Sequence, residues 1–195
     1  RLVRPTCGSS CGAASITSNK VTTSGDDGIG IFGRGDTGGV RITSGAVATT
    51  GLRAHGIQAV PTTGDIVVDS TGSISVVGGP ASGIHARSTS GDITVSVNDI
   101  EVRGNGNGID LAATNGGDIT LAVNGNVSLY GGGQFAAALL GGAGDKHVTV
   151  GADGLLFGTG SGIVSQGRTL VLDNHGTNRG NGARPVPNAV PGGGV

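Results

Sequence analysis

The sequence has few of the residues that usually build an aromatic core or a helix. Its 195 residues include no Trp, no Met, one Tyr and three Phe. A core organised around aromatic rings is therefore excluded. Strong helix formers are equally scarce, because Glu101 is the only glutamate and Lys20 and Lys146 are the only lysines. This composition excludes a predominantly helical protein.

Charge of one sign and long apolar runs are also lacking. The formal net charge is −1 and the basic residues are not clustered, which argues against nucleic-acid binding. No apolar run approaches the roughly 18 residues of a membrane-spanning helix, so we expect no membrane insertion by this segment. The chain starts at Arg1 without a Met or an apolar leader. We therefore expect a mature or excised part of a longer protein.

Cysteine is represented by two residues only, Cys7 and Cys11. Their close spacing in an extended terminal segment favours a small disulfide loop and an oxidising compartment. Two free thiols are the alternative interpretation.

Glycine, in contrast, is abundant, with 42 residues. The sequence that contains these glycines has an internal repeat of about 26 residues. Similar segments start at Asp65, Asp92 and Asp118. The first apolar column of the repeat is predicted to contain Ile66, Ile93, Ile119 and Val148. The column of the third strand is predicted to contain Ile29, Ile57, Ile84, Ile109, Phe135 and Ile163.

Each repeat contains three short runs in which apolar and polar residues alternate, the pattern of β-strands with one buried face. Strands this short bury their apolar face only if equivalent strands of successive repeats stack in parallel. The sequence therefore predicts an all-β protein, a right-handed parallel β-helix with three short strands per coil and about six coils of ~26 residues. An antiparallel sandwich would require hairpins at a spacing of about 8–12 residues.

The corners and ends of the repeats complete the predicted organisation. One corner aligns polar residues that we expect to form a hydrogen-bonded ladder, namely Thr71, Asn98, Asn124 and Asp153. Residues 1–14 are predicted to be an N-terminal cap or extension, and residues 15–175 the β-helix repeats. Residues 176–195 are predicted to be a Gly/Pro-rich linker or disordered tail.

Several of these segments resemble a known family. The stretch from Val21 to Phe32, and the strands at Gly91 to Val95 and Gly117 to Leu121, resemble the β-helical repeats of bacterial autotransporter passenger domains. They are also similar to filamentous-haemagglutinin-like adhesins, and the resemblance covers about Ser15 to Asp173. It implies export across the outer membrane and display on the bacterial surface as an adhesin, a stalk or an enzyme carrier.

An Arg-Gly-Asp tripeptide follows one of the expected strands, at Arg34, Gly35 and Asp36. In an exposed glycine-rich loop, a guanidinium and a carboxylate at this spacing form a candidate binding motif for a host integrin. Chance occurrence is the competing interpretation, because so short a motif has a high false-positive rate.

A second candidate is the polar stripe that Gln58, His85 and Asp110 form, each directly after the inward-facing Ile of its third strand. A carbohydrate-active β-helix would carry paired carboxylates on such a stripe. Here Ala136 and Val164 are predicted to continue the stripe, and Arg87 is the only charged residue expected beside Asp110. We therefore interpret the stripe as a solvated face and name no catalytic residue.

No cofactor or metal is predicted, since the four histidines lack zinc-like spacing and the calcium-binding nonapeptide does not recur. The favoured function is that of a non-enzymatic β-helix on the bacterial cell surface or in the extracellular space, an adhesin or structural stalk. Its expected partners are a host-cell or matrix surface, or copies of itself end to end. A self-assembling extracellular filament subunit and a carbohydrate-active β-helix enzyme are the alternatives.

Overall fold

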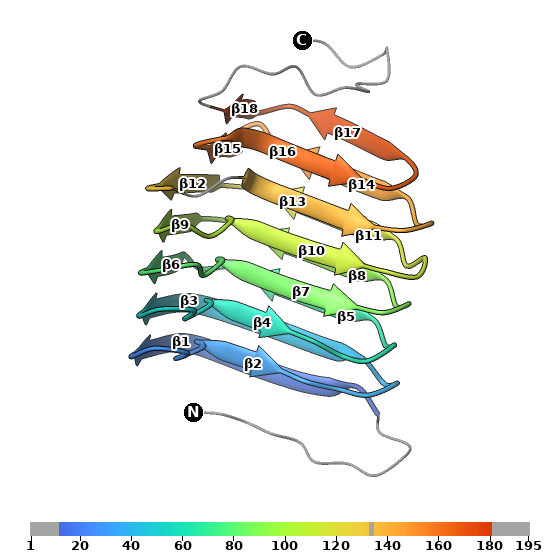
Figure 1. The fold of residues 1–195 in the computed structure, drawn as a ribbon, viewed down its shortest axis with the longest axis horizontal. Helices are drawn as coiled ribbons and strands as arrows, with labels where there is room; N and C mark the ends of the chain where they lie inside the picture. Colours follow the sequence, from blue (N-terminus) through green and yellow to red (C-terminus); the bar gives the residue numbers. More distant parts are fainter. Residues whose placement is uncertain (1–11, 133–134, 181–195) are drawn as a thin grey trace.

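A computed structural model describes residues 12–132 and 135–180. Cys7 and Cys11 lie outside these residues, so their disulfide stays a prediction. The described chain winds as a parallel β-solenoid whose strands form three faces (Figure 1). The predicted all-β fold, with three strands per coil and about six coils, is confirmed. Within the described ranges no helix is long and apolar enough to cross a membrane.

The three faces follow one another around each coil. The first face contains β1 (Ala14–Ser24), β3 (Val40–Thr50), β5 (Ile66–Ser70), β8 (Ile93–Val97), β11 (Ile119–Val123), β14 (Lys146–Val150) and β17 (Leu170–Asn174). The second contains the distal halves of β1 and β3 with β6 (Ile74–Val77), β9 (Ile100–Arg103), β12 (Asn126–Tyr130), β15 (Leu155–Gly158) and β18 (Thr177–Gly180). The third contains β2 (Ile31–Gly33), β4 (Ile57–Ala59), β7 (Ile84–Ser88), β10 (Ile109–Ala113), β13 (Phe135–Gly141) and β16 (Ser161–Gln166).

β1 and β3 are long enough to continue around a corner, and they join the first and second faces into one sheet of 12 strands. The third face is a separate sheet of six parallel strands. These six strands define six coils, and β17 and β18 add part of a seventh. The repeats therefore extend from Ala14 to Gly180, slightly beyond both ends of the predicted range 15–175.

The strand register confirms part of the predicted columns and corrects the rest. Ile66, Ile93 and Ile119 are aligned as expected, but the next residue in their column is Lys146, because Val148 pairs with Leu121. In the third face the aligned residues are Ile31, Ile57, Ile84, Ile109, Ala137 and Ile163. Ile29 and Phe135 therefore lie outside this column. Repeats of unequal length shifted the sequence alignment by two residues at these places.

The core is a set of aliphatic columns that run along the solenoid axis. Inward-facing residues such as Ile57, Ile84, Ile93 and Ile119 are at most 1% exposed. Each residue packs on its counterparts in the coils above and below, so burial is repeated at every coil. The aliphatic stack replaces the aromatic core that the composition excludes.

Glycine is required where the chain turns sharply into the third face. A Cβ atom on Gly56 would lie 2.6 Å from Ile74 Cγ2, and one on Gly108 would lie 2.5 Å from Val127 Cγ1. Both distances are far shorter than a normal contact. The second face packs its aliphatic side chains against the bare backbone of this corner, which brings the third face close to it.

Side-chain hydrogen bonds also run from coil to coil at the corners. Asn98 Nδ2 donates to the carbonyl oxygen of Thr71 over 2.8 Å, and Asn124 Nδ2 donates to Ser96 Oγ over 3.4 Å. After β14 the equivalent position is Gly151, whose N–H donates to Val123, so Asp153 is not aligned with Asn124. A second ladder lies before the first-face strands. There a carboxylate oxygen of each aspartate accepts the backbone N–H of the next, along Asp65, Asp92, Asp118 and Asp145.

Candidate functional site: a polar cluster on the third face

The outer side of the third face carries the candidate site. Because side chains alternate along a strand, every second residue of β7 and β10 points outward. The outward residues that directly follow the aligned core column are Phe32, Gln58, His85, Asp110, Ala138 and Val164. Two residues further along the strands, the register aligns Arg87, Ala112, Leu140 and Gln166. In the first of these columns, polar residues thus occupy the middle coils, with apolar residues on both sides.

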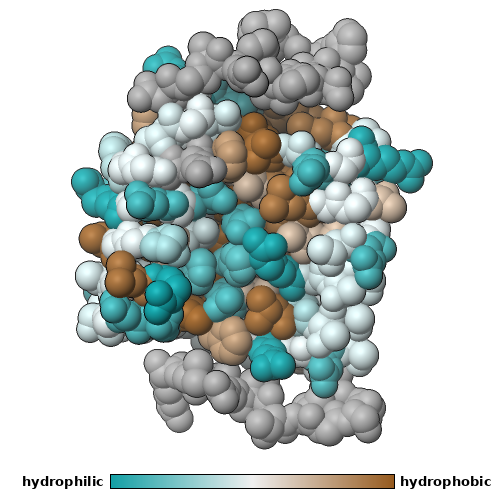
Figure 2. Space-filling view, viewed as in Figure 1, coloured by the Kyte–Doolittle hydropathy of each residue, from teal (hydrophilic) through white to brown (hydrophobic). Residues whose placement is uncertain are grey.

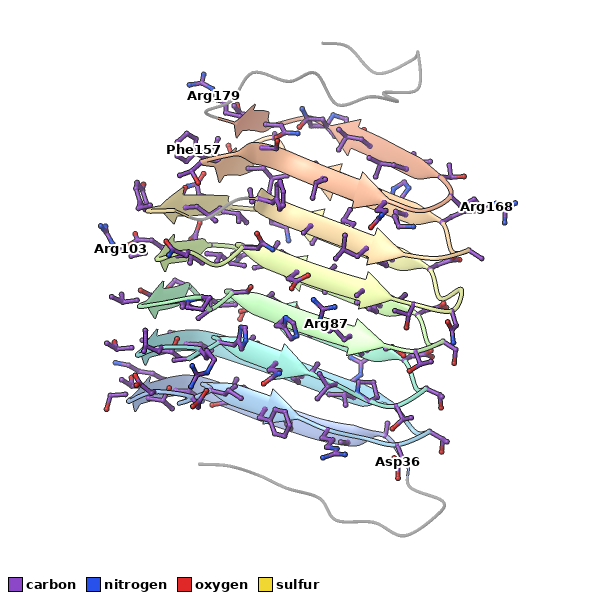
Figure 3. The ribbon with its side chains drawn as sticks, in the orientation of Figure 1. Asp36, Arg87, Arg103, Phe157, Arg168 and Arg179 are labelled. Carbon is purple, nitrogen blue, oxygen red and sulfur yellow. The ribbon has the colours of Figure 1, made fainter. Side chains whose placement is uncertain are left out.

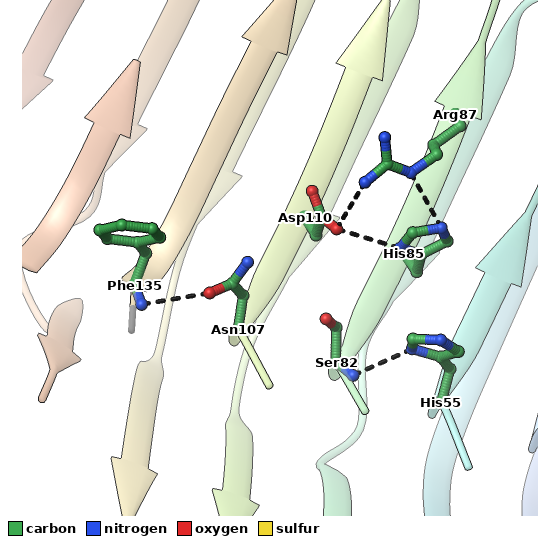
Figure 4. A network of polar contacts seen from close by, with 7 residues as sticks. All are labelled: His55, Ser82, His85, Arg87, Asn107, Asp110 and Phe135. Carbon is green, nitrogen blue, oxygen red and sulfur yellow. Dashed lines mark hydrogen bonds and ion pairs between the residues drawn. The ribbon is translucent and has the colours of Figure 1, made fainter. Parts of the chain in front are cut away.

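The centre of the cluster is an ion pair between neighbouring coils (Figure 4). Arg87 Nη2 donates to Asp110 Oδ2 over 3.0 Å, and its Nε donates to His85 Nε2, also over 3.0 Å. His85 Nδ1 lies 3.1 Å from Asp110 Oδ2. Because Nε2 accepts from Arg87, the proton of neutral His85 is on Nδ1, which donates to the carboxylate. The three side chains form a closed triangle.

Asp110 is unusually buried for an outward-facing carboxylate, with 8% of its surface exposed. Its second oxygen, Oδ1, is buried and has no hydrogen-bond partner among the described residues. Burial alone would raise the pKa of Asp110, but the hydrogen bond from His85 and the charge of Arg87 outweigh it and lower that pKa. The carboxyl group is therefore ionised at neutral pH, and an ionised buried oxygen without a partner costs folding free energy.

His55 extends the cluster by one coil. Its ring stacks on His85 with a centroid distance of 4.8 Å and an interplanar angle of 25°. The backbone N–H of Ser82 donates to His55 Nδ1 over 2.9 Å. Burial is the main cause that lowers the pKa of His55, and the charge that His85 can carry lowers it further. A neutral His55 with its proton on Nε2 fits these contacts.

The apolar part of the face begins beside the triangle, on the strand that carries Asp110. Ala112 is aligned with Arg87, and Ala138 is aligned with Asp110. Both alanines point outward, yet each is only 2% exposed. Leu140 and Phe135, which are half-buried, continue this apolar area. Figure 2 shows the result as hydrophilic surface in the middle of the face and hydrophobic surface nearer its ends.

The predicted stripe of Gln58, His85 and Asp110 is therefore confirmed as one column, but its interpretation as a solvated face is wrong for Asp110. Its apolar continuation is Ala138 rather than Ala136, because β13 pairs with β10 two residues later than expected. The approach of His55 to His85 was not predicted. A signal was present in the sequence, since both histidines lie close to the glycine of the same corner in successive repeats.

The Arg-Gly-Asp tripeptide lies elsewhere, at the corner after β2 (Figure 3). Arg34 and Asp36 are exposed. Asp36 Oδ1 accepts a hydrogen bond of 3.1 Å from the Thr62 hydroxyl, and the N–H of Thr62 donates to the carbonyl of Gly35 over 3.2 Å. The loop is thus fastened to the next coil along the corner. Integrin binding through Arg34, Gly35 and Asp36 stays a prediction.

The arrangement is better suited to binding than to proton transfer. Both nitrogens of His85 are engaged within the triangle, so neither is available to a substrate without a rearrangement. Arg87 keeps unused N–H groups on a half-exposed side chain. In the part of the chain that the structure describes, no three His, Cys, Asp or Glu side chains converge closely enough to hold a metal ion.

Comparisons with protein-family models, with curated proteins and with solved structures found no match to this chain. The fold and the cluster are consequently the basis for the functional argument.

Proposed function

We propose that the chain is a non-enzymatic β-solenoid of the bacterial cell surface or extracellular space, which acts as a stalk and presents its third face for adhesion. The observation that supports this most directly is the path of the chain. It enters the solenoid at β1 in the first coil and leaves it at β18 in the last (Figure 1). A surface or domain attached at one end would therefore lie six coil spacings, about 29 Å, from one attached at the other end.

The hydrogen-bond pattern makes such a spacer rigid along its axis. Strand pairings connect the first six coils to one another on all three faces and connect the sixth coil to β17 and β18 on two faces, and all of these pairings are parallel. Corner bonds such as the one from Asn98 to Thr71 add further links in the same direction. Because these bonds lie along the axis, stretching the rod would break many of them together.

The rod is tested with spin labels placed in one outward column. Thr22 and Arg179 belong to the same column of the second face, at its two ends. Both are exposed. We expect Thr22→Cys and Arg179→Cys, in a background with Cys7 and Cys11 changed to Ser, to give one narrow distance distribution near 30 Å. A broad distribution would contradict a rigid stalk.

Adhesion is tested with beads coated with the whole chain and washed under flow over epithelial cells and over immobilised matrix proteins. We expect retention above that of albumin-coated beads. Equal retention would contradict the adhesin function. Release of new reducing ends from a polysaccharide panel would instead favour the carbohydrate-active alternative.

The filament alternative has its own supporting observation. Among the described strands, β1 pairs only with β3 and β17 pairs only with β14, so each end of the solenoid has a strand edge without a described partner. A cavity of about 480 Å³ at the first coil is lined by residues that include Ile16, Val21 and Ile31. Parallel edges of this kind favour end-to-end stacking. Fibres in negative-stain micrographs of the purified chain would favour this function over the stalk.

A further inference from the structure

On the proposal above that the third face is adhesive, Arg87 is the group through which this face would hold a ligand. Two of the five N–H groups of its guanidinium bond to His85 and Asp110. Both N–H groups of Nη1 and one of Nη2 remain, and Figure 4 shows Nη1 directed away from these two partners. The side chain is 45% exposed, so these N–H groups are accessible from solvent.

The guanidinium is held in place before any ligand arrives. Asp110 and His85, with side chains 12% and 15% exposed, fix Nη2 and Nε from two directions. A long side chain that is already oriented loses less conformational entropy on binding. The neighbouring coils hold Ala138 and Val164 in the column of Asp110, so the charged triangle is confined to one place on the face.

One polar atom of the triangle is left unsatisfied by the described residues. Asp110 Oδ1 is buried and has no partner in the described part of the chain, whereas an alanine at this position, as in the next coil, leaves no acceptor unsatisfied. Such an unpaired buried group in a folded protein calls for an explanation. Orientation of Arg87 supplies one, because the carboxylate holds Nη2 while Nη1 is directed away from it.

The remaining N–H groups of Nη1 and Nη2 form the end of a planar fork, which matches the two oxygens of a carboxylate. The half-buried Leu140, which is aligned with Ala112 two coils from Arg87, provides an apolar surface on the same face. The face also carries neutral groups suited to hydroxyls, namely Gln58 and His55 in the coil before Arg87 and Asn107 in the coil of Asp110, all half-buried. A ring that combines a carboxylate, hydroxyl groups and an apolar C–H face has complementary chemistry to all three parts.

We infer that the third face binds an acidic saccharide, with Arg87 as the carboxylate subsite and Leu140 as the apolar surface for a sugar ring. An extended peptide fits less well, because peptides add to a sheet through free backbone groups at an edge. β7 and β10 are interior strands, paired on both sides, so their backbone groups are already used.

The test uses the whole chain on an array that pairs acidic saccharides with neutral counterparts. The acidic members are a hyaluronan hexasaccharide, a galacturonate oligomer and sialyllactose. The neutral members are the carboxyl-reduced forms of the first two and lactose. We expect at least one acidic saccharide to bind at 150 mM salt while its neutral counterpart does not. Binding of neither acidic nor neutral members, or equal binding of both, would overturn the inference.

Variants then test the role of Arg87. We expect Arg87→Gln to weaken binding of the selected saccharide roughly ten- to a hundredfold, the loss for a hydrogen-bonded charged pair. Arg87→Lys keeps the charge but not the fork, and we expect it to recover only a minor part. The matched control is Arg103→Gln, because Arg103 lies on the second face, paired with Glu101 and stacked over Tyr130. If Arg87→Gln and Arg103→Gln bind the saccharide with equal affinity, and both are folded by circular dichroism, Arg87 is not part of the site.

The two proposals fail separately. Bead adhesion without any preference for acidic saccharides would leave the adhesin function intact and refute this ligand class. Saccharide binding that depends on Arg87, without bead adhesion, would support the site and refute the adhesin function.

Discussion

Two neighbouring strands of equal length, β10 and β11, have nearly the same alternation in sequence and very different surroundings. In β11 (Ile119–Val123), Thr120 is exposed and Ala122 is half-buried, as expected for a strand with one solvated side. In β10 (Ile109–Ala113), all five residues are buried, including the outward-facing Asp110 and Ala112. The inner sides are alike, since Leu111 and Leu121 are both completely buried.

The difference teaches that the outer side of a strand takes its character from the adjacent coils. Asp110 is covered because the side chains of His85 and Arg87, in the preceding coil, contact its carboxylate. Thr120 is aligned with Thr94 and His147, two exposed residues that do not cover it. We expect substitutions on the inner side to have similar effects in β10 and β11, and substitutions on the outer side to have different effects.

The largest effect is expected on the inner side, and it should be the same in both strands. Leu111→Ala and Leu121→Ala each remove a completely buried side chain from the aliphatic stack. We expect each to lower the free energy of unfolding by about 2–5 kcal/mol, measured in urea titrations. A large difference between the two would show that the inner sides are not equivalent.

On the outer side the strands should diverge. Asp110→Ala removes the acceptor of both His85 and Arg87, and we expect a loss of about 1–3 kcal/mol. Its matched control, Thr120→Ala, alters the corresponding exposed position of β11 and should change stability by about 0.5 kcal/mol or less. Similar urea midpoints for the two variants would contradict the role of the triangle in stability.

The third prediction concerns Lys146, which continues the core column of β11 into β14 and is 2% exposed. Burial lowers the pKa of this amine, and Nζ donates to the carbonyl oxygen of Gly144 over 2.9 Å. Lys146→Met keeps the length of the side chain and removes the desolvated charge. We expect the variant to be more stable by about 1 kcal/mol in the same titrations. A loss of stability would mean that the bond to Gly144 outweighs the cost of burial.

The smallest effect is a pH dependence at His55. Because its pKa is lowered in the folded chain, the unfolded chain binds a proton first as the pH falls below about 6.5. The stability contributed by neutral His55 is therefore complete above that pH and is lost towards the lower pKa of the folded state. We expect His55→Gln to reduce the decline of unfolding free energy between pH 7 and 5, by less than about 1.4 kcal/mol per pH unit.

The exposed His147 is the control for this experiment. His147→Gln, measured in the same way, controls for the replacement of a histidine by glutamine at an exposed site. Equal slopes for the wild type and the His55→Gln variant would contradict the shifted titration of His55.

Much of the fold was predictable from the sequence, because alternation and repeat length are local properties. The predicted columns were wrong where repeats differ in length. Lys146 and Ala137 entered them in place of Val148 and Phe135, since only hydrogen bonding between coils selects the register. The stripe of Gln58, His85 and Asp110 was also predictable, but its burial was not, because side chains that are 23 or 25 residues apart cover Asp110.

The sequence by itself determined that this protein is a parallel solenoid. Its strands are too short to bury an apolar face alone, and a repeat of about 26 residues offers stacking as the way to bury it. The tertiary structure alone decided which polar residues meet. Arg87, His85 and Asp110 form a triangle because the register places β7 and β10 side by side at one particular offset. A shift of this offset by a single residue would turn Asp110 into the core and remove the site.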